Sequence, residues 1–370
     1  MKITCAKNDL LSALRFTSKA ISPKPQTPLL GALYLHADGD TAEVHGNNNE
    51  TGLIAKLPAE VSEHGSIAIT ARYFQEVITK LPGDEVNIDY DFQKRVAHIT
   101  SAQADFRLLS MDPNAYPTVK HFDGNLSFVA KDTELREVIK KTVFACANDP
   151  NRPLFTGVSV QVRKDHVVWA ATNSHRLSVN TLHLAEPTTS INMIVPGRFL
   201  LDVYHNLNSE VPIDVKVTCS YNSMSFEFEN VFMTTRLLEG AFPDFNRVIP
   251  ADFATKVHMD TAEFRSAVDR VALIARSTEY NIILLDFEND KVMISSVNKE
   301  VGQANEEVAA RIDGPNISIA FNSQYIVDAL KNIDSKTITF CMNQPLTAAR
   351  IIEDGADDFV YVVTPVRTAR

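Results

Sequence analysis

Cysteine is scarce in this chain of 370 residues, which contains four. Cys5, Cys146, Cys219 and Cys341 lie far apart and form no CxxC pair. This spacing excludes both a cysteine-based zinc site and the disulfide framework of a small secreted protein. We therefore expect four buried thiols in a reducing compartment.

Long apolar runs are also missing. No stretch approaches the roughly 18 apolar residues that a membrane-spanning helix needs. The first residues, MKITCAKNDLLSALRF, lack the apolar core of about 7–15 residues that marks a signal peptide. We expect a cytoplasmic protein with no membrane partner.

The sequence contains none of the common catalytic signatures. GxGxxG, GxxxxGK[ST], HExxH and GxSxG are all absent, and the ten histidines show no ligand spacing on one helix face. We therefore predict a protein that is not an enzyme, with no catalytic residues, no cofactor and no metal.

Charge and hydrophobicity describe an ordinary globular chain. Hydrophobic residues make up 45% and charged residues 22%, which is enough apolar material for several packed cores. The formal net charge of −10 argues against a nucleic-acid partner. A net charge does not say where the charges lie, however, so a local basic surface stays possible.

The most informative feature is an internal repeat. The segments 3–21, 128–146 and 257–275 each read as a short apolar strand, a cluster of helix-capping residues and an amphipathic helix, with offsets of 125 and 129 residues. A second helix recurs at 70–81, 195–207 and 320–333, where Tyr73, Phe199 and Tyr325 align at offsets of 126 residues. Two helices with one period make a chance match improbable.

Alternating apolar and polar residues between these helices predict strands with one buried face. The clearest cases are 85–90, 95–100, 214–219, 225–230 and 291–297. We predict an α+β chain of three repeated domains, with boundaries at 1–122, 123–253 and 254–370. Each domain reads as strand, helix, about three strands, helix and about three strands.

Several segments in this framework resemble the bacterial sliding clamps, the beta subunits of DNA polymerase III. They are PLLGALYL (28–35), ATNSHRLSV (171–179), LEGAFPDFNRVIP (238–250), FNSQYIVDAL (321–330) and YVVTPVR (361–367). The resemblance covers the whole chain. It implies a head-to-tail homodimer whose six domains form a ring, with helices lining the hole and sheets outside. Such a ring encircles duplex DNA at the nucleoid and tethers the replicative polymerase, conferring processivity.

Helix geometry independently favours two chains in a ring. Twelve helices spaced by about 10 Å give a circle with a hole near 28 Å, and a duplex is about 20 Å wide. Six helices would leave only about 9 Å. A ring made from one chain could not enclose DNA.

Basic residues recur on the predicted helices despite the acidic total. The resemblance implies DNA contacts at Lys24 and Arg198, and the repeated helix positions add Arg72, Arg136 and Lys140. A weakly basic lining would let the ring slide without gripping. The alternative is that these cations lie on ordinary solvated helix faces.

The resemblance also implies a pocket between the second and third domains that binds short peptides of the Gln-Leu-x-Leu-Phe type. Its partners would be the polymerase alpha subunit, the clamp-loader delta subunit, and repair and translesion polymerases. The chain departs from the family at Asn173-Ser174, where Asp-Gly is usual, and in having Thr368, Ala369 and Arg370 after the usual end. The matching pocket positions are Phe155, Thr172, His175, Arg176, Leu177, Pro243, Arg247, Val248, Asn322, Tyr325, Val363, Thr364, Pro365, Val366 and Arg367.

For the joint between the two chains, the resemblance points to Phe106 and Leu108 in the first domain and to Leu273 and Ile274 in the third. The alternative is that all four belong to intradomain cores. Two other functions stay open at this point: a clamp relative that binds peptides or sequesters a drug without serving replication, and a scaffold unrelated to DNA.

Overall fold

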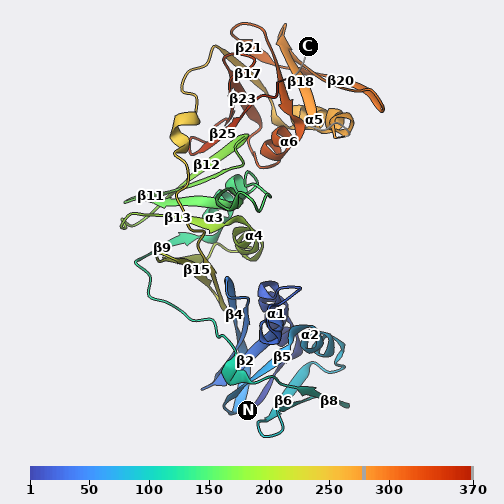
Figure 1. Cartoon of the computed structure of the whole chain (residues 1–370), viewed down its shortest axis with the longest axis vertical. Helices are drawn as coiled ribbons and strands as arrows, with labels where there is room; N and C mark the ends of the chain where they lie inside the picture. The colour runs from blue at the N-terminus through green and yellow to red at the C-terminus, as the bar shows by residue number, and fades with distance from the viewer. Residues whose placement is uncertain (277–280, 368–370) are drawn as a thin grey trace. The chain divides into compact units, whose positions relative to one another are not determined.

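The computed structural model describes residues 1–276 and 281–367, and its six α-helices lie where the repeat predicts them (Figure 1). Each is amphipathic, with its apolar stripe buried. None of the helices in the described chain is long and apolar enough to span a membrane. The helices are α1 (Lys7–Thr17), α2 (Ala71–Lys80), α3 (Asp132–Val143), α4 (Gly197–Asn206), α5 (Thr261–Ala275) and α6 (Ser323–Lys331).

The described chain divides by packing into two compact units. The first unit comprises Met1–Asp132 and Asn208–Leu237, and the second comprises Thr133–Leu207 and the residues from Leu238 onward.

The first unit contains one sheet of twelve strands, which branches at its longest strand, β4. The first half of β4 pairs with β3 and β16, and its second half pairs with β1. Helices α1 and α2 contact each other and bury Leu10, Leu14 and Phe74 in the core (Figure 1). The strands are β1 (Lys2–Ala6), β2 (Ala32–Asp38), β3 (Thr41–Asn47), β4 (Thr51–Glu63), β5 (Gly65–Thr70), β6 (Glu85–Asp91), β7 (Val96–Ser101), β8 (Ala104–Leu109), β9 (Leu126–Lys131), β14 (Asp214–Cys219), β15 (Ser223–Phe228) and β16 (Val231–Arg236).

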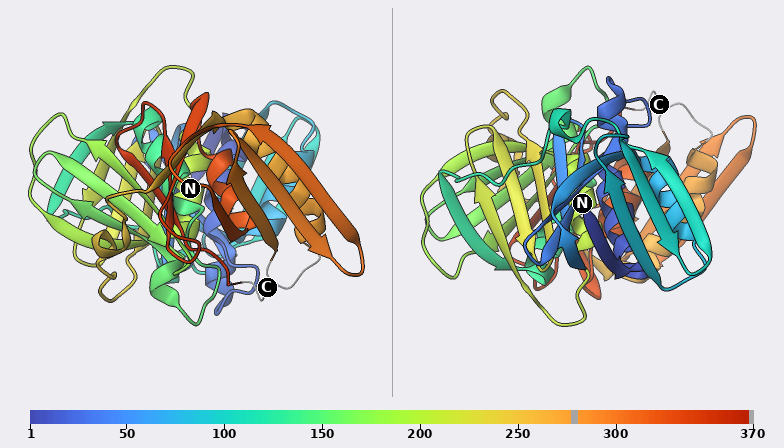
Figure 2. Two further views of the ribbon diagram at one scale, coloured as in Figure 1. Left: turned by 90° about the horizontal axis from the view of Figure 1, so that it is seen from above. Right: turned by 90° about the horizontal axis from the view of Figure 1, so that it is seen from below.

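The second unit contains a nine-stranded sheet and a four-stranded sheet. Helices α5 and α6 pack against each other over a core that includes Phe264, Phe321 and Phe340. The orange strands of the four-stranded sheet lie side by side in Figure 2. The strands are β10 (Gly157–Val162), β11 (His166–Thr172), β12 (Arg176–His183), β13 (Ile191–Pro196), β17 (Thr255–Asp260), β18 (Ile282–Glu288), β19 (Lys291–Asn298), β20 (Gly302–Ala309), β21 (Arg311–Asp313), β22 (Ile317–Asn322), β23 (Thr337–Met342), β24 (Ala349–Glu353) and β25 (Phe359–Val363).

The two large sheets run across the repeat boundaries. Strand β16 of the central repeat pairs with β4 of the first, with Phe232 opposite Ile54. Strand β12 of the central repeat pairs with β25 of the third, with Leu177 opposite Val362. The strands of the central repeat are therefore shared between the two units. The boundaries 1–122, 123–253 and 254–370 remain a prediction about the sequence repeat, and Thr368–Arg370 lie outside the described residues.

Candidate functional site

An apolar cavity of about 280 Å³ opens beside the paired strands β12 and β25. Eight of the predicted pocket residues line it: Phe155, Thr172, His175, Arg176, Leu177, Pro243, Val248 and Thr364. The other lining residues are Ser174, Phe242, Asp244, Phe245, Ala348 and Val362. Small apolar cavities with a few polar groups at the rim are typical of sites that accept side chains of a ligand.

Strand alternation explains the apolar floor of this cavity. Successive side chains of β12 point to opposite faces of the sheet. Leu177 and Val179 therefore share one face, where they pack with Phe245 and Val362. The guanidinium of Arg176 lies on the other face of the strand, where it contacts Asp328. Strand β12 therefore supplies the apolar floor with one face and an ion pair with the other.

The wall opposite β12 is aromatic. Residues Phe245–Val248 form a short 3-10 helix, and Asp244 caps it by accepting a hydrogen bond from the backbone N–H of Asn246. The ring of Phe242 lies 6.3 Å from that of Phe155 and 6.4 Å from that of Phe245, both edge to face. Val248 remains 57% exposed at the mouth. An apolar mouth of this kind suits apolar anchor residues of a peptide.

Arg176 is buried and its charge is already paired. Its Nη1 donates to Oδ2 of Asp328 at 2.6 Å, and its Nη2 donates to the carbonyl oxygen of Phe144. The guanidinium also lies 4.8 Å from the ring centre of Tyr325. These contacts occupy two of its nitrogens, while its buried Nε has no hydrogen-bond partner among the described residues. That Arg176 orients a peptide's polar groups stays a prediction. His175 is exposed and lies at the rim.

Seven predicted pocket residues do not line this cavity. Val363 is fully buried in the core of the C-terminal repeat, because alternation along β25 turns Val362 to the cavity instead. The side chain of Asn322 accepts a hydrogen bond from the N–H of Gln324 and so caps α6. The others are Arg247, Tyr325, Pro365, Val366 and Arg367.

These other residues lie around the cavity or beyond it. Arg247 is exposed and pairs with Asp244 at 3.0 Å, and Tyr325 stacks on the ring of His175. Val366 donates its N–H to Ala320, and Val366 and Arg367 line a separate groove of about 560 Å³ beside β22.

Sequence reasoning missed six lining residues, of which Phe242 and Phe245 are the largest. They flank Pro243 in a segment with no strand or helix periodicity. Two aromatic residues in such a segment are a usable signal, because a loop has no periodic face of its own on which to bury them. Val362 was missed because its position differs from that of Val363 only by the register of β25.

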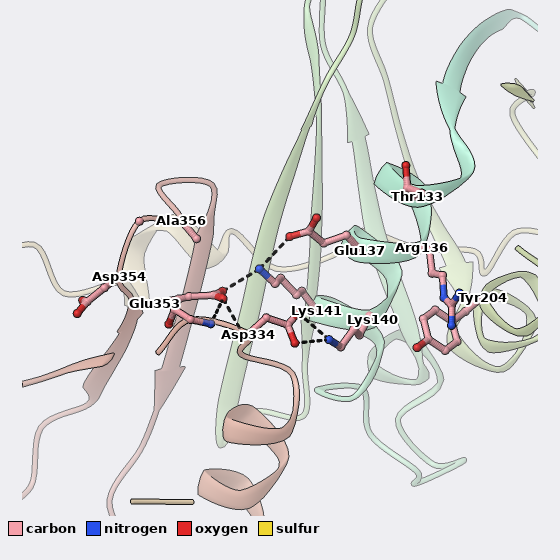
Figure 3. Close-up of a pocket in the computed structure, with 12 residues that line it drawn as sticks. Thr133, Arg136, Glu137, Lys140, Lys141, Tyr204, Asp334, Glu353, Asp354 and Ala356 are labelled. Carbon is pink, nitrogen blue, oxygen red and sulfur yellow. Dashed lines mark hydrogen bonds and ion pairs between the residues drawn. The ribbon is translucent and has the colours of Figure 1, made fainter. Parts of the chain in front are cut away.

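Two of the predicted DNA-contacting cations lie in a polar cleft of about 550 Å³ beside α3 (Figure 3). The Nζ of Lys140 donates to both carboxylate oxygens of Asp334, at 2.9 and 2.8 Å. The guanidinium of Arg136 lies 4.9 Å from the ring centre of Tyr204. The charge of Lys140 is thus compensated within the chain, which weakens its case as a phosphate contact.

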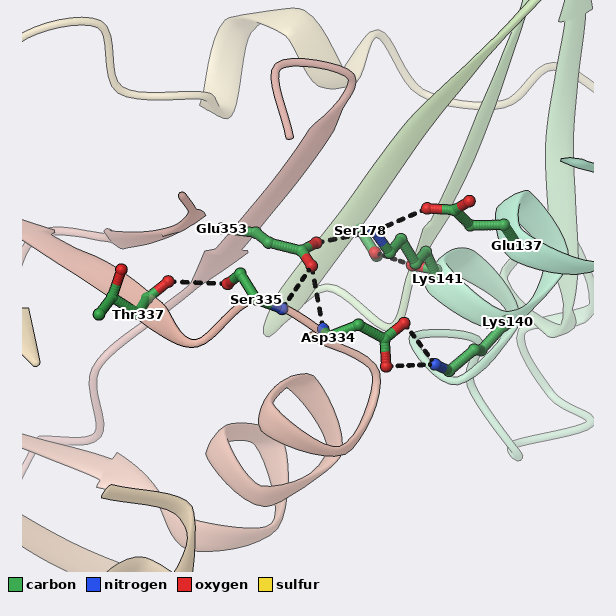
Figure 4. Close-up of polar contacts among 8 residues, drawn as sticks. All are labelled: Glu137, Lys140, Lys141, Ser178, Asp334, Ser335, Thr337 and Glu353. Carbon is green, nitrogen blue, oxygen red and sulfur yellow. Dashed lines mark hydrogen bonds and ion pairs between the residues drawn. The ribbon is translucent and has the colours of Figure 1, made fainter. Parts of the chain in front are cut away.

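Lys141, the neighbour of Lys140, is buried in the same cleft (Figure 4). Its Nζ contacts Glu353 at 2.7 Å and Glu137 at 2.9 Å. Burial acts to lower the pKa of Lys141, but the hydrogen bonds that its ammonium group donates to Glu353 and Glu137 outweigh burial, and the pKa is raised. The cleft therefore brings cations and carboxylates together and carries no excess of positive charge.

The other three predicted DNA contacts are exposed. Lys24 lies in the loop that precedes the 3-10 helix Pro28–Gly31, and Arg198 lies in the first turn of α4. Arg72 is on α2 and pairs with Glu76 at 3.0 Å, one helical turn away. Lys24 and Arg198 are therefore the strongest candidates among the five.

The predicted joint residues lie near free edges of the sheets. Strand β8, which carries Phe106 and Leu108, is the last strand of the twelve-stranded sheet, and β20 is the last strand of the four-stranded sheet. Phe106 is 38% exposed and Leu108 is half-buried against the core. Leu273 on α5 is 63% exposed, and Ile274 is half-buried.

Comparison with known proteins gives one consistent family. The DNA polymerase III beta subunit is matched through its N-terminal domain at residues 1–120, its central domain at 130–244 and its C-terminal domain at 246–367. The chain is 31% identical to the beta sliding clamp of Staphylococcus aureus over 377 residues, covering 100% of both sequences. It is similarly close to the beta sliding clamp of Staphylococcus epidermidis, with 31% identity over 381 residues.

Solved structures agree over the full length. The chain superposes on the DNA polymerase sliding clamp of Bacillus subtilis with a TM-score of 0.96 and 28% identity, covering 100% of both chains. The DNA polymerase III subunit beta of Pseudomonas aeruginosa gives a TM-score of 0.94 and 27% identity, again over 100% of both.

Proposed function

The chain belongs to the family of DNA polymerase III beta subunits, the bacterial beta sliding clamps, and on that premise we propose how its residues serve that function. A sliding clamp is a processivity factor and not an enzyme. The chain encircles duplex DNA as a homodimer and tethers the replicative polymerase, together with other replication and repair proteins, to its template.

The observation that carries this proposal is the cavity beside β12 and β25. Its apolar floor of Leu177 and Val362 and its aromatic wall of Phe155 and Phe242 can receive two apolar side chains of an extended peptide. The exposed His175 offers a polar contact at the rim. Partners with a short apolar motif in a flexible segment fit this site: the polymerase alpha subunit, the clamp-loader delta subunit, and repair and translesion polymerases.

The two protomers assemble head to tail, so that β8 of one chain meets β20 of the other. A free strand edge presents unpaired backbone N–H and C=O groups, and two such edges can continue one sheet across a joint. Phe106, Leu108, Leu273 and Ile274 supply the apolar contact beside that ladder. A heterologous joint of this type closes into a ring when it is repeated by symmetry.

Lys24 and Arg198 contact the phosphate backbone inside the ring. Both are exposed, and backbone contacts by a few cations carry no sequence preference. A small number of such contacts, on a chain with a net charge of −10, leaves the ring free to move along the duplex. We place the protein at the nucleoid in the cytoplasm.

A topological experiment tests this function. The protein is loaded on nicked circular plasmid with a bacterial clamp loader and ATP, and the complex is isolated by gel filtration. We expect the protein to stay with the circular DNA and to be lost once a restriction enzyme linearises it. Retention on linear DNA would indicate ordinary binding instead of encirclement, and failure to load at all would contradict the proposal.

A further inference from the structure

The turn between β11 and β12 holds a residue in an unfavourable backbone conformation. Ser174 has φ of +76°, in the left-handed region where the Cβ of any residue other than glycine is crowded. Its N–H donates to Oγ1 of Thr172 at 3.0 Å, and the side chain of Asn173 accepts from the N–H of His175 at 3.0 Å. These local bonds support a conformation that serine does not prefer.

Arg152, from a different part of the sequence, fastens the same turn. Its Nη1 donates to Oγ of Ser174 at 3.0 Å and to the carbonyl oxygen of Asn173 at 3.3 Å. Its guanidinium also lies 5.8 Å from the ring centre of Phe155, which lines the cavity. Arg152 thus connects the strained turn to the aromatic wall.

On its other side the turn holds the segment that follows β25. The carbonyl oxygen of His175 accepts hydrogen bonds from the N–H of Thr364 at 2.9 Å and from its Oγ1 at 3.0 Å. The ring of His175 stacks on Tyr325, with 6.3 Å between centroids and 14° between planes. Residues 173–175, which we call the 173–175 turn, therefore connect the Phe155 wall of the cavity, through Arg152, to its Thr364 wall.

We propose that Arg152 is a positioning residue for peptide binding, which acts through Ser174 to keep the 173–175 turn in place. The inference rests on the peptide-binding role proposed above. Without Arg152, the turn relaxes toward a backbone conformation that serine prefers, and the His175 carbonyl moves away from Thr364. The cavity then loses the fixed separation of its two walls, and a peptide must restore it on binding.

The test uses the full-length protein and a fluorescein-labelled peptide, Gln-Leu-Ser-Leu-Phe, in an anisotropy titration. We expect Arg152→Ala to raise Kd by about 5- to 10-fold, the effect of releasing a left-handed serine. In the Ser174→Gly background the same substitution should raise Kd by less than about 3-fold, because glycine adopts a positive φ without crowding. Arg163→Ala, which removes an arginine bonded to Asn192 and Gln161, is the matched control with unchanged Kd.

Two results would overturn the inference while leaving the proposed function intact. One is wild-type affinity in the Arg152→Ala protein. The other is an equal loss of affinity in the Ser174 and Ser174→Gly backgrounds, which would mean that Arg152 touches the peptide itself. The thermal unfolding temperature of each variant is measured as well. A local change at the rim of the cavity should leave this temperature unaltered, whereas general destabilisation should lower it. No binding by the unaltered protein would overturn the proposed function, and this inference with it.

Discussion

The Nζ of Lys141 lies 2.7 Å from Oε2 of Glu353, and both side chains are only 4% exposed. The pair links α3 of the central repeat to β24 of the third. Oε1 of the same carboxylate accepts the backbone N–H groups of Asp334 and Ser335, at 2.9 and 3.1 Å. Removing Lys141 leaves the charge of Glu353 buried with only these two N–H groups to stabilise it, which costs more than the pair itself contributes.

Lys141→Met should therefore destabilise the protein by about 3–5 kcal/mol in urea denaturation. Lys140→Met is the matched control, because the adjacent lysine pairs with a largely exposed carboxylate, and its loss should cost less than about 1 kcal/mol. Equal unfolding midpoints for the two variants would show that the buried pair has no special role.

Leu177→Ala should weaken binding of a Gln-Leu-Ser-Leu-Phe peptide by about 10-fold, because Leu177 forms the floor of the cavity. Val179→Ala provides the control, since Val179 lies on the same face of β12 and in the same apolar cluster but does not line the cavity. Anisotropy titration measures both. Similar losses in the two variants would place the peptide elsewhere.

Leu273→Ala combined with Ile274→Ala should convert the dimer to a folded monomer in analytical ultracentrifugation. The expected cause is loss of apolar contact at the joint, since exposed ion pairs contribute little. Leu201→Ala, which alters an exposed leucine on α4, should leave the dimer intact. A double variant that stays dimeric at micromolar concentration would mean that the joint lies on another surface.

Lys24→Glu combined with Arg198→Glu should weaken DNA binding equally for all sequences. The slope of log K against log salt should fall in magnitude by up to about 4, because the homodimer loses two phosphate contacts on each protomer. Lys164→Glu with Lys216→Glu, two exposed lysines outside the helices, makes the same charge change and should leave the slope unaltered. An unchanged slope in the first variant would remove both residues from the DNA path.

The cysteines should be inert toward a thiol reagent at pH 8. Burial raises the pKa of Cys5, Cys146 and Cys219 to about 12 and that of Cys341 to about 11, so very little thiolate is present in the folded protein. We expect no reaction with a disulfide dye until denaturant is added, when four thiols react. Cys5, Cys219 and Cys341 are buried and Cys146 is half-buried, so rapid labelling of any of the first three in the native protein would contradict the burial.

The helices could be predicted because each carries its own signal. The 3.6-residue spacing of apolar positions fixes which face is buried, and α2 at Ala71–Lys80 and α4 at Gly197–Asn206 lie within one or two residues of the predicted spans. The alternating segments behave in the same way, and β6 at Glu85–Asp91 and β14 at Asp214–Cys219 confirm them.

The site was only partly predictable, because pocket membership depends on strand register. A shift by one residue reverses the face to which a side chain points, and this separates Val362, on the cavity wall, from Val363, in the core. Loop aromatics such as Phe242 leave no periodic trace. The pairing of Lys140 with Asp334 joins residues that are 194 positions apart, which no local pattern can reveal.

The sequence by itself determined the α+β class, the threefold repeat, the six helices and the family, because these follow from local periodicity and from the order of motifs along the chain. Only the tertiary structure decided which side chains share a space. It placed Leu177 opposite Val362, paired Arg176 with Asp328, and brought Arg152 into hydrogen-bond contact with Ser174, whose φ is +76°. Such contacts join segments that are distant in the sequence. Their geometry is set by sheet pairing and packing in the folded chain, which no local sequence pattern records.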